Sequence, residues 1–558
     1  MLHDNLVNAA MGRIPFDMVI GNANLVNVFT GEIHPASIGI KDGHIAYVDW
    51  ESRELSARQY MDAEGRYAIP GLVDAHMHIE SSMVTPAAFA EGVLPHGTTV
   101  VAADPHEIAN VLGVDGVKML LDASRNLPLK VYMMIPSTVP SLPGMESSGA
   151  EIGPEEVAMM LEFPGIIGLG EVMDFWGVIN LDEKITGVID QVRRRGGLIE
   201  GHSPVFSGKE LQAFIAAGVD SDHTIMDEEK VKEKLRLGMN VQIQERFITP
   251  ELMQYINTLP DPSNFILVTD DVTADRLMTK GHLDFLIKKA IKCGLDPVLA
   301  IQATTIRPAR RLRLFKHGCI GPGRVADILL LSSLEDFVVD TVIADGEVVA
   351  QSGNMVKSIE YPKFPQKAYD TVKLSKLSPE DFIIKTRRQH GIATVNAVAV
   401  NDINSRTSLE QVDVPIHEGQ LDIKALGLST MAVFERHGKT GTKNLGFIKN
   451  LGDFKGAMAT TYAHDCHNLV VIGTNAADMT LAANTLIRAG GGMAAVKDGK
   501  ILSLVELPIA GLLSDKKMKD VVEDVISFAA TLKQMGIRHR EPVMLLTILA
   551  LAVSPEVK

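Results

Sequence analysis

Between about residues 65 and 315 the sequence repeats one rhythm: a short apolar segment, a polar loop, and then an amphipathic segment with helical spacing. Strands that alternate with helices pair in parallel, because each helix carries the chain back across the sheet. Eight such units in about 250 residues predict a (β/α)8 barrel. The eight expected strands, in chain order, are LVDAHMH, TTVVAAD, KVYMMIP, IIGLGEV, LIEGH, VDSDH, NVQIQE and FILVTD.

Two segments of a different character flank the barrel. In residues 17–50 and 324–352, apolar and polar residues alternate along the chain. Both segments contain tight turns, such as KDGH and ADGE, so both indicate β-meanders. We expect the flanks to pair into one small β-sandwich domain, followed by a C-terminal α+β domain, within an α/β fold class. The expected ranges are 1–65 for the first part of the small domain, 66–315 for the barrel, 316–365 for its second part and 370–558 for the C-terminal domain.

Charge and cysteine usage narrow the partners and the compartment. The net charge of -15 disfavours nucleic acid and anionic membranes as partners. Three cysteines, far apart in sequence, do not make a disulfide framework and suit a reducing environment. The N-terminus lacks a signal-peptide pattern, and the longest apolar stretch, VMLLTILALAV, is too short to cross a bilayer. We therefore expect a cytoplasmic protein.

Histidines and carboxylates gather at the ends of the expected strands. His76 and His78 lie two residues apart in a strand, so both rings face the same side. In a barrel the C-terminal strand ends meet at one mouth, where catalytic residues lie. Four histidines and two carboxylates there would suit two divalent metal ions. The expected ligands are His76, His78, Glu171, His202, His223 and Asp270, with Glu171 placed to bridge the two ions.

These residues allow two other interpretations. Any one of the histidines alone would more often be a packed polar residue, but six candidates at five strand ends favour a metal site. The triplet HIE at 78–80 also matches the H-x-E part of a zinc deaminase motif. That motif needs a following P-C-x-x-C, and the three cysteines are too widely spaced to supply it.

Longer stretches carry a resemblance to a known family. PGLVDAHMHIESS and GPGRVADILLL resemble the amidohydrolase superfamily, whose members are metal-dependent hydrolases. Several other stretches resemble the bacterial adenine deaminases of that superfamily, and the likeness spans nearly the whole chain. They include ADPHEIANVLG (103–113), GLGEVMDFWGVI (168–179), GHSPVFSGKELQAFIAAG (201–218), VTDDVTADRL (268–277) and AHDCHN (463–468).

The resemblance implies a hydrolase of purine salvage that acts on a cyclic amidine C–N bond, converting adenine to hypoxanthine and ammonia. It implies two divalent metal ions, with manganese as the first choice and iron or zinc as alternatives. It also implies that Glu171 replaces the carboxylated lysine of dihydroorotase and hydantoinase relatives. No lysine lies between residues 131 and 183, which agrees with that replacement.

A mechanism follows as a hypothesis. A hydroxide that bridges the metal ions attacks C6 of adenine, and Asp270 takes its proton and passes it toward the leaving ammonia. Glu171 and Asp270 are therefore the expected catalytic residues. The expected substrate-binding residues are Asp104, His106, Glu107 and Glu245, since a buried purine must have its hydrogen bonds met. For Asp104 the alternative is that it caps the helix starting near Glu107.

Several alternatives stay open. IQERF (243–247) and SDHT (221–224) depart from the family's I-R-E-G-S and S-D-H-E, so another amino-heterocycle or a cyclic amide is an alternative substrate. A non-catalytic barrel is less favoured, because unpaired ligands would cost stability. His464 and His467 suggest either a structural cluster or a second metal site. We expect a homodimer or a higher homo-oligomer.

Overall fold

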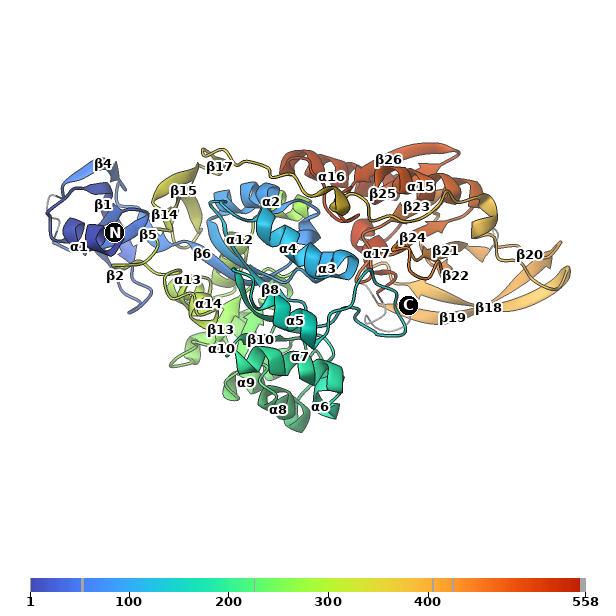
Figure 1. Cartoon of the computed structure of the whole chain (residues 1–558), viewed down its shortest axis with the longest axis horizontal. Helices are drawn as coiled ribbons and strands as arrows, with labels where there is room; N and C mark the ends of the chain where they lie inside the picture. Colours follow the sequence, from blue (N-terminus) through green and yellow to red (C-terminus); the bar gives the residue numbers. More distant parts are fainter. Residues whose placement is uncertain (1, 52–54, 225, 404–405, 424–425, 552–558) are drawn as a thin grey trace.

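The chain forms three parts that follow one another along its long axis (Figure 1). A computed structural model describes residues 2–51, 55–224, 226–403, 406–423 and 426–551. A small β domain that contains the N-terminus lies at one end, the barrel lies in the middle, and the C-terminal domain lies at the other end. Within these described ranges, no helix combines the length and apolar character that a bilayer crossing requires.

The central part is the predicted barrel of parallel strands. Its strands form a five-stranded sheet in the order β10-β9-β8-β7-β6 and a three-stranded sheet in the order β11-β12-β13. A parallel bridge between Met77 and Asp270 joins the end of β6 to the segment that follows β13. All eight expected strands are present: β6 (Leu72–Met77), β7 (Thr98–Ala103), β8 (Lys130–Ile135), β9 (Ile166–Val172), β10 (Leu198–Gly201), β11 (Ser221–Asp222), β12 (Asn240–Ile243) and β13 (Phe265–Leu267).

Helices connect these strands, and α7 (Glu183–Arg194) shows why such segments are helical. The Asp182 side chain accepts hydrogen bonds from two amides of its first turn. Its buried residues recur at i, i+3, i+4 and i+7, namely Ile185, Val188, Ile189 and Val192. The other helices are α2 (Pro86–Val93), α3 (His106–Leu112), α4 (Val114–Ala123), α5 (Pro154–Met160), α6 (Phe175–Asn180), α8 (Gly208–Ala216), α9 (Glu228–Arg236), α10 (Pro250–Thr258), α11 (Ala274–Lys280), α12 (Leu283–Lys292), α13 (Pro297–Ala303) and α14 (Ile306–Arg311).

Both flanks of the barrel contribute to one small sheet. Its order is β17-β16-β15-β14-β5-β1-β2-β3, and β4 pairs with β1. The central pair joins β5 (Tyr67–Pro70), which runs directly into the barrel, to β14 (Ile328–Ser333), with Pro70 opposite Ile328. The remaining elements are α1 (Leu2–Ala10), β1 (Phe16–Val26), β2 (Ile33–Lys41), β3 (His44–Asp49), β4 (Ala57–Asp62), β15 (Val338–Ala344), β16 (Glu347–Gln351) and β17 (Asn354–Met355).

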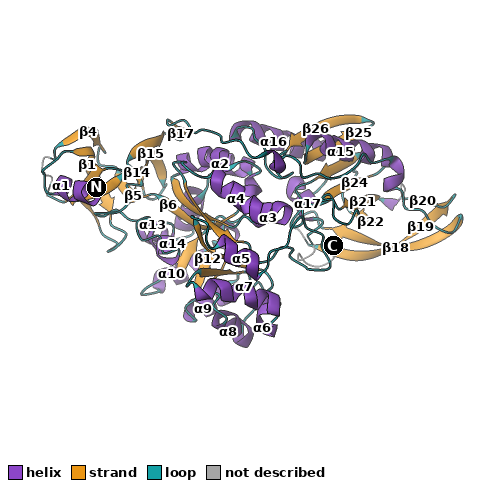
Figure 2. Cartoon of the chain, in the orientation of Figure 1, coloured by secondary structure: helices purple, strands orange, loops and turns teal. Residues whose placement is uncertain are grey.

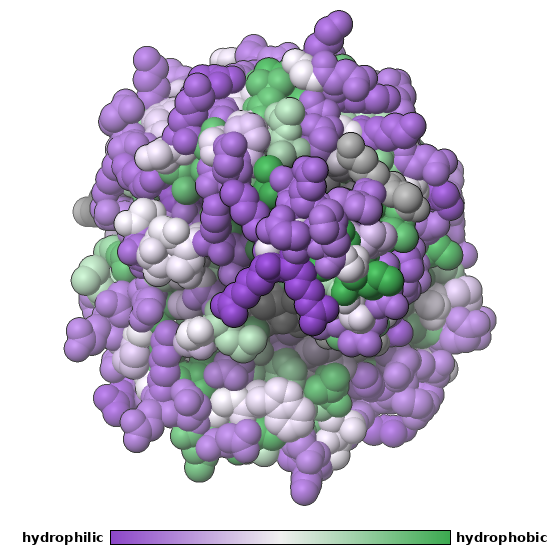
Figure 3. All heavy atoms as spheres, turned by 90° about the vertical axis from the view of Figure 1, so that its right-hand side faces the viewer, coloured by the Kyte–Doolittle hydropathy of each residue, from purple (hydrophilic) through white to green (hydrophobic). Residues whose placement is uncertain are grey.

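The C-terminal domain is a mixed sheet with helices packed on it (Figure 2). Its strand order is β20-β19-β18-β22-β21-β24-β23-β25-β26. The elements are β18 (His390–Val400), β19 (Thr407–His417), β20 (Gln420–Leu421), β21 (Leu428–Phe434), β22 (Lys443–Lys449), β23 (Ala457–Thr460), β24 (Leu469–Gly473), α15 (Ala476–Ala489), β25 (Gly492–Lys497), β26 (Lys500–Glu506), α16 (Met518–Gln534) and α17 (Pro542–Ile548). Its outward end is mostly hydrophilic, with apolar residues in scattered groups (Figure 3).

The C-terminal domain also packs against the barrel. Helix α16 contacts both α11 and α2. The amide of Ser514 donates a hydrogen bond to the carbonyl of Met83, at 2.8 Å. The loop between β23 and β24, which contains His464 and His467, therefore belongs to a domain that is docked on the barrel.

Candidate active site

The six residues predicted as metal ligands lie together at the C-terminal ends of the barrel strands. All except His202 fall in overlapping groups whose nitrogen and oxygen atoms are close enough to hold metal ions. Four of the six side chains are more than nine-tenths buried, whereas Asp270 is 15% exposed and His202 33%. The residues are His76 at the end of β6, His78 directly after it, Glu171 in β9, His202 after β10, His223 after β11 and Asp270 after β13.

Asp270 faces the two histidines of the first strand. Its Oδ1 atom lies 3.6 Å from Nε2 of His76 and 3.2 Å from Nε2 of His78. Its Oδ2 atom accepts a hydrogen bond of 2.5 Å from the Gln244 amide. The Asp270 backbone has a φ of 58°, a left-handed conformation that aspartate tolerates better than most residues. One carboxylate oxygen is thus held by the protein while the other faces the histidines.

Glu171 has the geometry of a bridging carboxylate. Its Oε1 atom lies 3.6 Å from Nε2 of His78. Its Oε2 atom lies 2.5 Å from Nδ1 of His202 and 3.1 Å from Nε2 of His223. One oxygen is therefore directed to His78 and the other to the histidines that follow β10 and β11, as expected for a ligand shared by two ions.

Outer contacts fix the ring orientation of the first two histidines. Nδ1 of His76 lies 2.8 Å from Oε2 of Glu200, and Nδ1 of His78 lies 2.9 Å from the carbonyl oxygen of Asp104. Both acceptors require a proton on Nδ1, so Nε2 of each ring is the free ligand atom. Nε2 of His76 is buried and has no hydrogen-bond partner among the described residues. The rings are therefore oriented as metal ligands are.

The carboxylates also shift the pKa values of these histidines. Burial alone would lower the pKa of His76, but Glu200 and Asp270 outweigh it and raise that pKa well above its ordinary value. For His78 the Asp270 contact outweighs burial in the same way and raises the pKa to about 10. Metal uptake must therefore displace protons from both rings, which makes it dependent on pH.

Asp104 lies behind the candidate metal centre. Its Oδ2 atom accepts a hydrogen bond of 2.9 Å from the amide of Glu171, and its side chain is buried. Helix α3 begins after Pro105 without a side-chain cap, so the capping alternative for Asp104 is wrong. The reason is that the carboxylate accepts its hydrogen bond from Glu171 of β9, two strands away in the sheet, and not from the helix. Asp104 thus holds the backbone of Glu171.

His106 and Glu107 extend the site toward the C-terminal domain. Nδ1 of His106 lies 3.6 Å from Oε1 of Glu171, and Nε2 of His106 lies 3.4 Å from Oε1 of Glu107. His106 also groups with His78 and Glu171 as a set able to hold an ion. Glu107 is fully buried and contacts histidines of the C-terminal domain.

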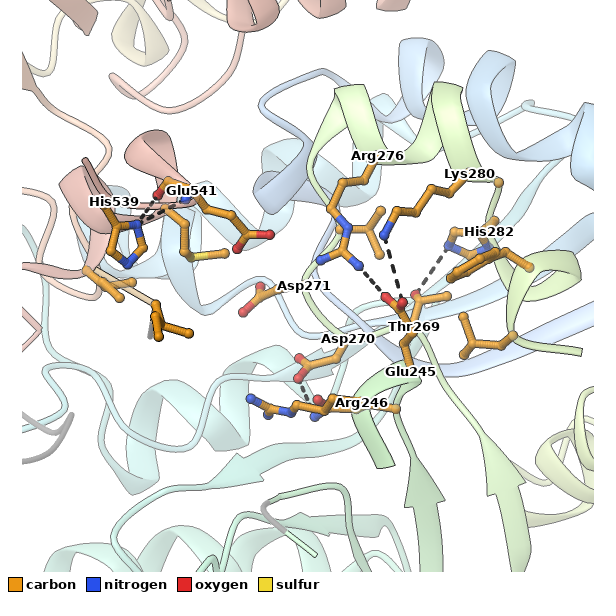
Figure 4. A pocket seen from close by; sticks show the side chains of 18 of the residues that line it. Glu245, Arg246, Thr269, Asp270, Asp271, Arg276, Lys280, His282, His539 and Glu541 are labelled. Carbon is orange, nitrogen blue, oxygen red and sulfur yellow. Dashed lines mark hydrogen bonds and ion pairs between the residues drawn. The ribbon is translucent and has the colours of Figure 1, made fainter. Parts of the chain in front are cut away.

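A cavity of about 440 Å³ opens on Asp270 between the barrel and the C-terminal domain (Figure 4). This volume falls within the range of small-molecule sites. Glu245 lines it and pairs with Arg276 and, at 3.8 Å, with Lys280. The opposite wall carries His539 and Glu541 of the C-terminal domain. The structure thus places all ten predicted site residues around one mouth, with Glu245 at its outer edge.

Sequence reasoning did not single out Glu200, Arg311 and Gln244. The Oε1 atom of Glu200 accepts a hydrogen bond of 2.6 Å from Arg311, while its Oε2 atom contacts His76. A signal for Glu200 existed, because it lies two residues before His202 in a strand, the same spacing that relates His76 to His78. Arg311 lies in α14, and no local pattern marks it.

The parallel barrel and its mouth of histidines and carboxylates define the class of protein as an amidohydrolase. The model of the Amidohydrolase family matches residues 67–349, which is about half of the chain. The model described as the Adenine deaminase C-terminal domain matches residues 404–558. The chain belongs to the adenine deaminase family.

Similar proteins agree over nearly the full length. An adenine deaminase of Moorella thermoacetica is 41% identical over 99% of this chain and 94% of its own length. One of Ruegeria sp. is 39% identical over 99% of this chain and 94% of its own. One of Klebsiella pneumoniae is 41% identical over 91% of this chain and 85% of its own. The similarity therefore covers the barrel, the small β domain and the C-terminal domain together.

Proposed function

We propose that this protein hydrolyses adenine to hypoxanthine and ammonia. The observation that carries the proposal is the similarity to adenine deaminases over 99% of the chain, at 41% identity for the Moorella thermoacetica protein. The site geometry supports it, because Asp270, predicted to transform the purine, and Glu245, predicted to bind it, line one cavity. The reaction belongs to purine salvage, and the substrate is a small molecule.

The donor set fits two divalent metal ions. His76, His78 and Asp270 would hold one ion, His202 and His223 the other, with Glu171 shared between them. Imidazole and carboxylate ligands suit manganese, iron and zinc alike, and we take manganese as the first choice. Such ions supply a water nucleophile that is deprotonated at neutral pH.

Asp270 is the proposed proton carrier of the reaction. Burial alone would raise its pKa, but His76 and His78 outweigh burial and hold the pKa of Asp270 well below its ordinary value. Asp270 is therefore ionised and able to accept the proton of the attacking water. It then delivers that proton to the amino group that leaves C6, so one water is consumed and one ammonia is released.

The remaining polar residues are proposed to surround the purine. A buried purine loses its hydrogen bonds to water, so donors and acceptors of the protein must replace them. His106 lies 3.6 Å from Glu171 and 3.4 Å from Glu107, and Glu245 lines the cavity. Asp104 is proposed to bind the purine as well: its Oδ2 atom accepts the hydrogen bond of the Glu171 amide, while its buried Oδ1 atom has no hydrogen-bond partner among the described residues.

We also propose a cytoplasmic location and a homodimer or a higher homo-oligomer. The location rests on the reducing environment that the three free cysteines suggest. The outward end of the C-terminal domain is mostly hydrophilic (Figure 3). Any self-association is therefore expected to use other faces of the molecule.

The test is ammonia release from adenine by protein stripped of metal and then reloaded with manganese. Fast release that depends on the metal, with hypoxanthine as product, supports both the substrate and the site. Parallel reactions with other amino-heterocycles and with cyclic amides address the alternative substrates. Protein that binds two ions but leaves adenine unchanged, while releasing ammonia from another heterocycle, would refute the proposed substrate.

A further inference from the structure

The loop between β23 and β24 of the C-terminal domain reaches the buried carboxylate of Glu107. Nδ1 of His464 lies 2.5 Å from Oε1 of Glu107, and Nε2 of His467 contacts Oε2 of the same residue. The Glu107 and His467 side chains are completely buried, and His464 is 12% exposed. Each oxygen of this carboxylate therefore has its own histidine from the C-terminal domain.

The hydrogen bonds of His467 fix which of its nitrogens carries the proton. The amide of Ala463 donates to Nδ1 of His467 at 3.1 Å, so Nδ1 is an acceptor without a proton. Burial lowers the pKa of His467, which favours the neutral ring. A neutral ring with an unprotonated Nδ1 carries its only N–H on Nε2, and that N–H points at Glu107.

This assignment argues against a further metal ion in the cluster. His106, Glu107, His464 and Asp465 are close enough to one another to surround an ion. His467 lies outside that group, but its Nε2–H already engages one oxygen of the shared Glu107 carboxylate. Asp465 is also engaged elsewhere, because Ser141 of the barrel donates to its carboxylate. The pattern is that of a carboxylate held by a hydrogen bond on Oε2 and by an ion-pair contact on Oε1.

Glu107 connects these histidines to the candidate metal centre. The Oε1 atom of Glu107 lies 3.4 Å from Nε2 of His106, and Nδ1 of His106 lies 3.6 Å from Oε1 of Glu171. The His106 ring thus lies between the held carboxylate and the proposed bridging ligand. Any displacement of Glu107 would change the surroundings of His106 at the barrel mouth.

The barrel also holds the histidine loop in place. The Asn468 amide donates a hydrogen bond of 2.9 Å to the carbonyl of Ser147, in the loop that follows β8. The amide of His464 donates to the carbonyl of Thr547 in α17, at 3.0 Å. Contacts on both sides therefore fix the positions at which the two rings contact Glu107.

We propose that His464 and His467 are positioning residues of the reaction: they fix the Glu107 carboxylate and, through it, the His106 ring at the wall of the substrate site. The C-terminal domain is then a part of the active site rather than an attached module. This inference rests on the proposed deamination of adenine, because Glu107 and His106 are assigned to the purine. The two histidines themselves do not touch the reacting atoms.

The experiment compares variants that remove the donors with variants that keep them. His467→Leu removes an N–H donated to a buried carboxylate, and His464→Leu removes the imidazole in ion-pair contact with its other oxygen. We expect kcat/KM for adenine to fall about 10- to 100-fold for each. Because the Gln amide can occupy the place of Nε2 and the Asn amide that of Nδ1, His467→Gln and His464→Asn should restore most of the loss. Metal content should stay at the wild-type value in all four variants.

Two controls separate positioning from general loosening. His437 donates from Nε2 to the carbonyl of Cys466, at 2.8 Å, so it supports the same loop without contacting Glu107. His437→Leu should lower the melting temperature but leave kcat and KM unchanged in the folded fraction. In the double variant Glu107→Gln/His467→Leu, the two losses should not add, because His467 acts only through Glu107.

A measurement without substrate keeps the inference independent of the reaction. In zinc-loaded protein, the proton NMR spectrum should contain low-field imidazole N–H signals from His464 and His467, each lost in its Leu variant. Wild-type protein that shows these signals but does not deaminate adenine would refute the proposed function alone. Leu variants with wild-type kcat and KM, additive losses in the double variant, or the loss of one metal equivalent would each overturn the positioning role.

Discussion

Replacement of Glu200 by Gln tests the candidate metal centre at its outer contacts. Glu200 is fully buried between Arg311, 2.6 Å from Oε1, and His76, 2.8 Å from Oε2. Burial alone would raise the pKa of Glu200, but Arg311 and His76 outweigh it and lower that pKa from 4.5 to about 2. This difference corresponds to about 3 kcal/mol of favourable interaction with the ionised carboxylate.

Glu200→Gln removes that interaction and leaves His76 without a charged acceptor for Nδ1. Loss of an outer partner of a ligating histidine typically weakens metal binding about 10- to 100-fold. We therefore expect the free manganese concentration at half-loading to rise by that factor. The assay titrates metal-free protein with manganese in competition with a fluorescent chelator, at constant pH. Turnover at saturating manganese should recover much of the loss.

The matched control breaks a buried ion pair at the other end of the barrel. Asp327 is 3% exposed and lies 2.6 Å from Nζ of Lys130, the first residue of β8. Asp327→Asn should lower the melting temperature as Glu200→Gln does, yet leave the manganese affinity unchanged. Equal manganese affinity in wild type and Glu200→Gln would refute the assignment of His76 as a ligand oriented by Glu200.

Three further outcomes are expected. Asp270→Asn should bring turnover of adenine down by about 10²- to 10⁴-fold while the fold is retained, which steady-state kinetics and circular dichroism would check. Nζ of Lys234 lies 2.9 Å from the completely buried carboxylate of Asp222. Lys234→Met leaves this carboxylate without its cation, so it should lower the free energy of unfolding in urea by about 3–5 kcal/mol. Burial alone would raise the pKa of Asp222, but Lys234 and His223 lower it from 3.8 to about 2. The stability that this carboxylate contributes is thus present above about pH 4 and is lost as the pH falls through about 2. The Asp222→Asn variant lacks this carboxylate, so its melting temperature should fall less steeply than that of wild type as the pH is lowered.

The barrel could be predicted from the sequence because its sequence pattern is local and repeated. Each strand is a short apolar run before a polar loop, so all eight expected strands are present. The rule that residues two apart share a strand face, combined with the shared mouth of a barrel, was enough to bring His76, His78 and Asp270 together. Neither inference required knowledge of side-chain packing.

Contacts between distant parts of the chain could not be predicted in this way. His467 meets Glu107 across 360 residues, and no periodicity records which loop of one domain docks on which loop of another. The hydrogen bond that Asp104 accepts from the Glu171 amide likewise depends on how β7, β8 and β9 align, which is seen only in the assembled sheet. The capping alternative was wrong for this reason, since it considered only neighbours in sequence.

The pairing of β5 with β14 has a consequence for how this architecture can be cut and joined. The chain enters the barrel after Pro70 and returns at Ile328, and these two residues are direct antiparallel partners. The entry and exit of the barrel therefore lie about 5 Å apart, the spacing of adjacent strands. A two-residue turn could join β5 to β14 and release the small sheet as a separate hairpin-linked unit. By the same geometry, the barrel is an insert that another antiparallel strand pair could accept without stretching either host strand.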